Sequence, residues 1–202
     1  MMNEQIREIR RLLRATMNGP VSHSMRQQGL NYRVNFGVDQ PRLLEIAATL
    51  PHDTDLAIAL WKEDTRELRL LAPMLMPHES MDQELALLWV EQIVHAEEAQ
   101  VLVLHLLRHL PIASALAFRL VASERDMERL VAWLLLGRLF MEGNAPSQRD
   151  ADELLDHLVT ELGDEKADPE VRRTALNTLY KYMELGASEE ARGERILQGM
   201  GL

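Results

Sequence analysis

The most constraining feature of this sequence is a helical unit that recurs along the chain. Each copy has an acidic or hydroxyl cap, an arginine a few residues later, and apolar residues at helical intervals. The copies cover 60–76, 123–140 and 168–183, and their arginines are Arg66, Arg129 and Arg172. The separations of 63 and 43 residues match helical repeats of about thirty to forty residues, with a further copy at 96–108 that lacks the arginine near its start. Because one helix pair cannot bury its apolar face alone, the units have to stack on one another.

Local signals place the helices. Asp64 and Glu67 have the spacing of a capping box at the start of the 60–76 helix, and Pro73 predicts a kink or an early end within it. The stretch 21–38 lacks a helical stripe and is expected to be an ordered loop, with a short helix near Ser24 as the alternative. Further helices are expected at 3–17, 41–50, 53–61, 80–94, 97–109, 111–122, 123–141, 147–162, 169–185 and 188–198. No stretch alternates like a strand, so the predicted fold is all-α: a curved α-solenoid of HEAT-like antiparallel helix pairs.

Composition favours one repeat domain over residues 1–202 in a cytoplasmic protein. The chain has no cysteine, no continuous apolar run long enough to span a membrane, and no secretory leader pattern. Its net charge of −10 is unevenly distributed. Residues 1–50 hold seven arginines against four acidic residues, a balance of +3, whereas residues 51–202 carry −13. A basic N-terminal part and an acidic set of repeats are therefore expected, with a local basic surface only.

Few residue patterns indicate chemistry. No phosphate-binding glycine loop or nucleophile elbow is present, and we expect no cofactor. His105 and His109 have a metal-ligand spacing, yet they flank an apolar helix without accompanying ligands, so we interpret them as structural and expect no metal. The tryptophans Trp61, Trp89 and Trp133 lie in apolar helical patterns, which favours core packing over base stacking.

The arginines are the most informative polar set. In stacked repeats they would recur on neighbouring helices, where they could hold phosphates without reading bases. The alternative is that each arginine pairs with an acidic cap of an adjacent repeat. The DNA-binding candidates are Arg33, Arg66, Arg69, Arg129, Arg172 and Arg173.

Four stretches resemble a known family. Phe36-Gly37-Val38 followed by Pro41-Arg42-Leu43 and Ile46-Ala47 resembles the loop and helix of the HEAT-like DNA alkylation repair proteins, the AlkD-type alkylpurine DNA glycosylases. The stretch 60–72 is similar to the next helix pair of that family, and 123–132 and 171–179 to later repeats. The resemblance implies an all-helical solenoid whose concave face holds duplex DNA. In active members, an aspartate and cleft tryptophans release cationic alkylated purines.

The positions that carry this activity depart from the family pattern. Leu102 stands at the expected place of the aspartate, and the later cleft tryptophan is missing near Asn177 or Thr178. A leucine cannot stabilise a positive transition state, a loss of several kcal/mol. Glu97 and Glu98 are the minority catalytic candidates if the alignment shifts.

Three hypotheses follow. The favoured one is a non-catalytic family member that binds the backbone of duplex or damaged DNA through an arginine-lined concave face. The alternatives are an active alkylpurine DNA glycosylase with a relocated carboxylate, and a HEAT-repeat scaffold that binds a protein partner.

Overall fold

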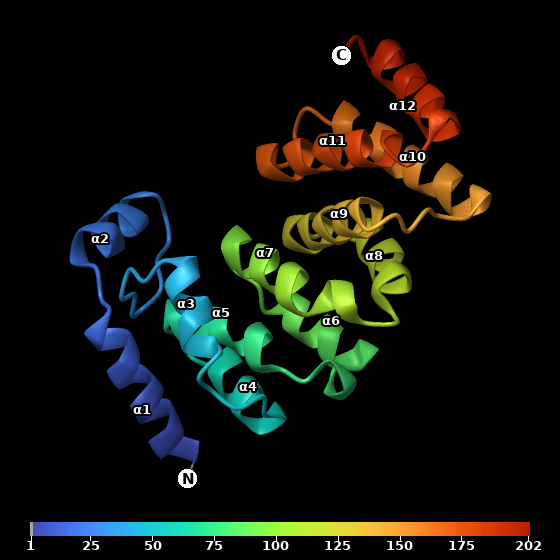
Figure 1. The fold of residues 1–202 in the computed structure, drawn as a ribbon. Helices are drawn as coiled ribbons and strands as arrows, with labels where there is room; N and C mark the ends of the chain where they lie inside the picture. The colour runs from blue at the N-terminus through green and yellow to red at the C-terminus, as the bar shows by residue number, and fades with distance from the viewer. Residues whose placement is uncertain (1) are drawn as a thin grey trace. The chain divides into compact units, whose positions relative to one another are not determined.

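The computed structural model describes residues 2–202, which form twelve α-helices and two short 3-10 helices (Figure 1). Within these residues there is no strand; Val34 and Thr65 form an isolated parallel bridge. The all-α prediction is confirmed. The chain divides into two compact units, Met1–Leu85 and Ala86–Leu202. None of the described helices is long and apolar enough to cross a membrane.

The first unit is built around the hairpin of α4 (Thr54–Trp61) and α5 (Arg66–Leu75). The helix α3 (Gln40–Ala47) packs on α5, and α1 (Met2–Ala15) packs on α4. Ile6, Ile9 and Leu13 are buried on one side of α1, as their spacing predicts. The unit also contains α2 (Gly19–Gln27) and the 3-10 helix η1 (His78–Ser80).

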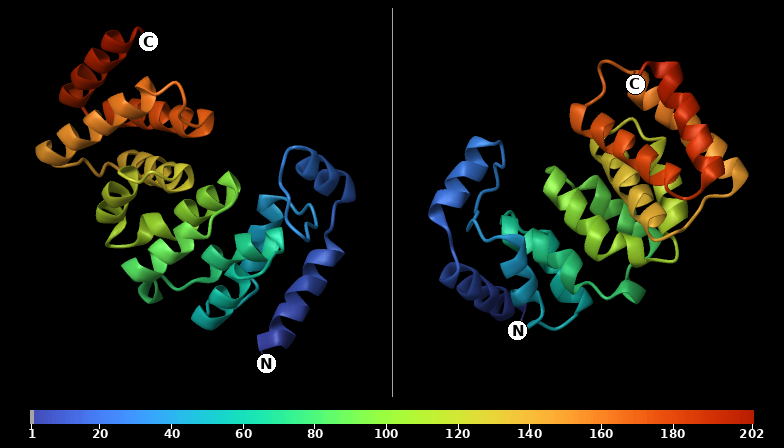
Figure 2. Two further views of the ribbon diagram at one scale, coloured as in Figure 1. Left: turned by 180° about the vertical axis from the view of Figure 1, so that it is seen from behind. Right: turned by 45° about the horizontal axis from the view of Figure 1, so that its top comes forward.

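The second unit is centred on α9 (Asp126–Met141), which packs against α7 (Ala96–His105), α8 (Ala113–Val121) and α11 (Pro169–Met183). Both views of Figure 2 show α11 lying along α9. The helices α10 (Gln148–Gly163) and α12 (Ala187–Met200) both pack on α11, and η2 (Leu107–His109) joins α7 to α8. The remaining helix, α6 (Gln83–Glu91), contains the division between the units.

Four predicted helix starts are confirmed by side-chain caps. Asp39 accepts from the Arg42 amide, Asp53 from Leu56, Ser147 from Asp150, and Asp168 from Glu170 and Val171. In each case a short polar side chain is followed directly by a helix, so the local sequence was enough to predict where the helix begins.

Other predicted boundaries are wrong. Asn18, Gly19 and Pro20 do not merely end the first helix; Asn18 caps α2, and Pro20 lies in its first turn. The helix start expected at Ser80 lies at Gln83, because residues 78–80 form η1. The helices expected from Pro111 and Ser123 begin at Ala113 and Asp126. Pro73 lies inside α5, which ends two residues later.

The predicted capping box of α5 is also wrong. The residue before α5 is Thr65, and its side chain makes no cap hydrogen bond. Asp64 instead accepts from the Arg33 amide, and Glu67 binds backbone amides of the 33–38 loop. Both side chains hold a segment about thirty residues earlier in the chain.

Candidate nucleic-acid interface

Arg66 and Glu67 form a buried ion pair that organises the 33–38 loop. Arg66 is 5% exposed and Glu67 is 0% exposed. The Arg66 guanidinium donates to the carbonyl of Val38 at 2.8 Å and to Glu67 at 3.1 Å. The Glu67 carboxylate accepts from the amides of Phe36 at 3.0 Å and Val38 at 3.2 Å. A guanidinium buried and engaged in this way is not available to a phosphate, so Arg66 has a structural role here.

The same loop is tied along its length. Val34 exchanges backbone hydrogen bonds with the start of α5, donating to the Asp64 carbonyl and accepting from the Arg66 amide. On the other side, Ser22 of α2 donates to the Asn35 carbonyl at 2.8 Å. The loop therefore holds Arg33 at a fixed place on the surface, where its side chain is exposed.

Arg69 is held within the α4–α5 hairpin. Its guanidinium lies 4.5 Å from the ring centroid of Trp61 and donates to the Trp61 carbonyl at 2.9 Å. A cation stacked on an aromatic face stabilises a helix hairpin and satisfies the end of α4. Arg69 is only partly buried, so one side of it faces solvent.

The later arginines also have partners within their own unit. Arg129 pairs with Asp126 and with Glu161, the latter at 2.8 Å, and donates to the Ser123 carbonyl. Arg172 donates to the Leu162 carbonyl at 3.1 Å. Arg173 is well exposed, and its pair with Glu170 at 3.3 Å lies on the surface. Such exposed pairs are weak, so the Arg173 guanidinium can exchange partners at little cost.

Four arginines in the first fifty residues are exposed and form no ion pair among residues 2–202; they are Arg7, Arg14, Arg26 and Arg33. Their neighbours differ, because Arg10 pairs with Glu63, Arg11 with Glu8 and Arg42 with Glu45. The four come from α1, α2 and the loop that follows α2 (Figure 1). We call them the free-arginine set. Arg33 is among the DNA-binding candidates predicted from the sequence, and the other three belong to the basic N-terminal part. Their lack of ion-pair partners is seen only in the structure.

The carboxylates considered for catalysis have structural environments. Glu98 is 1% exposed and accepts from the Val94 amide at 2.9 Å, which closes the first turn of α7. Glu97 lies in the same first turn. Leu102 is fully buried, and Thr178 binds the Trp133 carbonyl inside the α9–α11 contact. The positions expected to carry the activity are thus core positions, apart from the half-buried Glu97 and the exposed Asn177.

One carboxylate does lie beside a tryptophan. Glu161 accepts from the indole nitrogen of Trp133 at 3.3 Å and lines a cavity of 270 Å³. The Trp133 ring is 0% exposed and so cannot stack on a base. Arg129 also forms an ion pair with Glu161, so the charge of this carboxylate is already balanced by a neighbouring cation. Trp61 and Trp89 are each 1% exposed, which confirms the prediction of core packing for the tryptophans.

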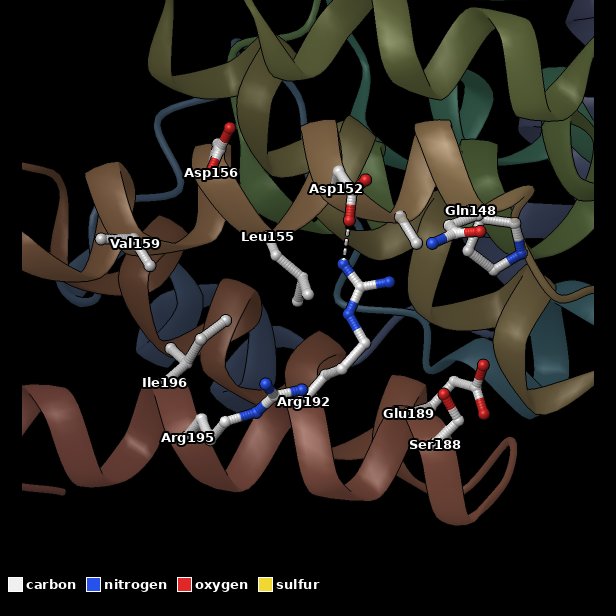
Figure 3. A pocket seen from close by; sticks show the side chains of 12 residues that line it. Gln148, Asp152, Leu155, Asp156, Val159, Ser188, Glu189, Arg192, Arg195 and Ile196 are labelled. Carbon is white, nitrogen blue, oxygen red and sulfur yellow. Dashed lines mark hydrogen bonds and ion pairs between the residues drawn. The ribbon is translucent and has the colours of Figure 1, made fainter.

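A larger groove of 870 Å³ lies between α10 and α12 (Figure 3). Arg192 of α12 pairs with Asp152 of α10 across it, and Leu155 and Ile196 contribute apolar side chains. Since charges of both signs line the groove and one pair is already neutralised, it does not match an extended polyanion.

Comparison with known proteins identifies the family. The family described as "DNA alkylation repair enzyme" matches residues 9–177, so this chain belongs to it. A solved structure described as "A new family of proteins related to the HEAT-like repeat DNA glycosylases with affinity for branched DNA structures" superposes with a TM-score of 0.83 at 15% identity. The match covers 95% of this chain and 81% of that chain, and it shows a shared HEAT-like fold. A search of functionally curated proteins found no match.

Proposed function

We propose that this protein is a non-catalytic member of the DNA alkylation repair family that binds DNA through backbone phosphates. The observation that carries this proposal is the free-arginine set, four exposed cations without ion-pair partners in a chain of net charge −10. In an acidic protein most surface arginines find carboxylates, so cations without them are suited to an external anion. Two further arginines can bind phosphate as well: Arg173, whose surface ion pair is weak, and Arg69, which is partly exposed. Arg66 does not take part, because it is buried.

Branched DNA is the form of nucleic acid to test first. The similar solved structure is described as having affinity for branched DNA structures, and the fold is shared. Contacts to phosphates carry no base sequence, so recognition by backbone geometry suits a protein whose tryptophans are all buried.

Charge-removal variants test the proposal. Arg26→Gln with Arg33→Gln removes two members of the free-arginine set, and is expected to weaken binding to a four-way junction about tenfold at 0.1 M salt. The matched control is Arg11→Gln with Arg42→Gln, which removes the same charge from arginines that are already paired. The Kd of the control is expected to stay within about threefold of that of the unmodified protein.

Equal losses of affinity in both variants would contradict the role of the free-arginine set. Absence of DNA binding at low salt would overturn the proposal and favour a protein-binding scaffold.

The alternative of a glycosylase with a relocated carboxylate rests on Glu161 beside Trp133. Incubating the full chain with N-methylated duplex DNA and measuring released purines separates the two. We expect release at the rate of DNA alone. Release that disappears in Glu161→Gln would establish the glycosylase and contradict the non-catalytic proposal.

A further inference from the structure

The contact between α9 and α11 places Lys181 of α11 beside Gly137 of α9, the residue that precedes Arg138, in the acidic second unit. Thr178 of α11 donates to the Trp133 carbonyl of α9 at 2.8 Å, which fixes the register of the two helices. One turn further along both helices, Lys181 lies against Gly137. A Cβ atom built on Gly137 would lie 3.1 Å from the Lys181 amine nitrogen, so the glycine leaves room for the lysine. Arg138 follows Gly137 directly on α9.

Neither cation is neutralised by a carboxylate at ion-pair distance. Among residues 2–202, Lys181 and Arg138 form no ion pair, and the Arg138 guanidinium donates a weak hydrogen bond to the sulfur of Met141 at 3.9 Å. Burial and then the charge of Arg138 lower the pKa of Lys181, while the charge of Glu184 raises it to a smaller extent. Lys181 and Arg138 are both half-buried, so the ammonium and the guanidinium group can each reach solvent.

Two like charges held together disfavour the folded state unless an anion lies between them. A phosphate oxygen supplies that anion, because guanidinium and ammonium groups both donate to it strongly. Metal ligation does not explain the pair, since Arg138 cannot lose its proton and a protonated guanidinium has no lone pair to offer a metal ion.

We propose that Arg138 and Lys181 form a phosphate-binding site on the α9–α11 surface that holds one backbone phosphate of bound DNA. This inference rests on the proposed function and assigns that function a contact in the second unit. The site was not among the arginines selected from sequence, because its two members lie 43 residues apart and only the helix register joins them.

Binding of the full chain to a fluorescent four-way junction, measured over a salt series, tests the site. Arg138→Met with Lys181→Met is expected to raise Kd about tenfold at 0.1 M salt and to reduce the slope of log Kd against log salt by about two. The matched control is Arg119→Gln with Lys166→Gln, which removes the same charge from the second unit at α8 and at the turn between α10 and α11, outside the proposed site. The control is expected to change Kd by less than threefold and the slope by less than about one.

Two further measurements separate a binding role from a structural one. Arg138→Lys keeps the charge and is expected to restore binding to within about threefold, whereas Arg138→Met alone weakens it. Lys181→Met removes the repulsion between Lys181 and Arg138, so the melting temperature is expected to rise, whereas the affinity for DNA is expected to fall. A variant that only lost packing contacts would lower both the melting temperature and the affinity.

Every outcome decides the inference. If the protein binds the junction but the double variant matches the control, the phosphate site is wrong and the proposed function stands. If Lys181→Met lowers both stability and affinity, the lysine is structural and the site is wrong. If the unmodified protein binds no DNA, the proposed function and this inference both fail.

Discussion

Glu67 is a helix residue whose side chain organises a loop outside its own helix. Its spacing from Asp64 predicts a capping box, yet both carboxylates hold the 33–38 loop instead. The reason is that a carboxylate satisfies whichever unpaired amides reach it, and burial of that loop left two amides beside Glu67. Local spacing identifies such a carboxylate as important but does not reveal its partner.

Neutralising Glu67 should therefore destabilise the first unit. Glu67→Gln removes the buried negative charge that pairs with Arg66 and accepts from the Phe36 and Val38 amides. We expect the free energy of unfolding to fall by about 3 kcal/mol. Urea unfolding followed by circular dichroism measures the change. Glu45→Gln, which removes the exposed partner of Arg42, is the control and should stay within about 0.5 kcal/mol. A loss for Glu67→Gln as small as that of the control would show that the pair does not hold the loop.

Gly37 gives a second test at the scale of single residues. Its φ is +71°, and an added Cβ would lie 2.2 Å from the Asn18 carbonyl oxygen and 2.7 Å from the Ser22 amide nitrogen. Both are backbone atoms that cannot rotate away. We expect Gly37→Ala to lower the free energy of unfolding by about 2–4 kcal/mol, combining steric overlap with left-handed strain.

Gly29→Ala is the matched control for this position. Gly29 also has a positive φ, of +94°, but nothing lies within 4 Å of a Cβ built there. Only the conformational strain applies, so a loss of about 1–2 kcal/mol is expected in the same urea experiment. Equal losses at the two glycines would contradict a close approach of the loop to α2.

At the scale of elements, the sequence predicted helices well where their start is local. The helices capped by Asp39, Asp53, Ser147 and Asp168 start within one residue of their predicted starts. Helix boundaries were predicted wrongly where the same residues can either end one helix or begin the next. Asn18-Gly19-Pro20 reads as the end of one helix, although an asparagine cap with proline in the first turn also begins one. The phosphate site on α9 and α11 could not be predicted, because it depends on how two helices align.

The end of α7 gives a pH-dependent prediction. Burial, together with the charges of Arg108 and His109, lowers the pKa of His105 below its ordinary value of 6.5. Its Nε2 atom has no hydrogen-bond partner among the described residues. Below pH 6.5 the unfolded chain therefore binds a proton that the folded chain resists, so stability falls as pH decreases through 6.5.

Melting temperatures at pH 7.5 and pH 5.5 measure this effect. We expect His105→Leu to lose less stability on acidification than the unmodified protein, because the leucine has no proton to take up. His23→Gln, at an exposed position on α2, serves as the control and should keep the full pH dependence. An unchanged pH dependence in His105→Leu would contradict the assignment.

At the scale of the whole molecule, an acidic chain carries a basic minority that the structure leaves accessible. The overall charge of −10 disfavours nucleic acid, and sequence reasoning could not decide between phosphate binding and an internal arginine ladder. The structure divides the arginines between the two: Arg66 and Arg129 are engaged internally, whereas the free-arginine set is not. The proposed DNA binding depends on the free-arginine set.

Salt dependence of DNA binding by the unmodified protein shows whether its exposed arginines contact phosphates. Fluorescence anisotropy with a four-way junction over about 0.05–0.2 M salt gives the slope of log Kd against log salt. Contacts from the free-arginine set predict a slope of about three or more, with tight binding at the lowest salt. A slope near zero, or no binding at the lowest salt, would contradict the claim that this protein holds DNA by its phosphates.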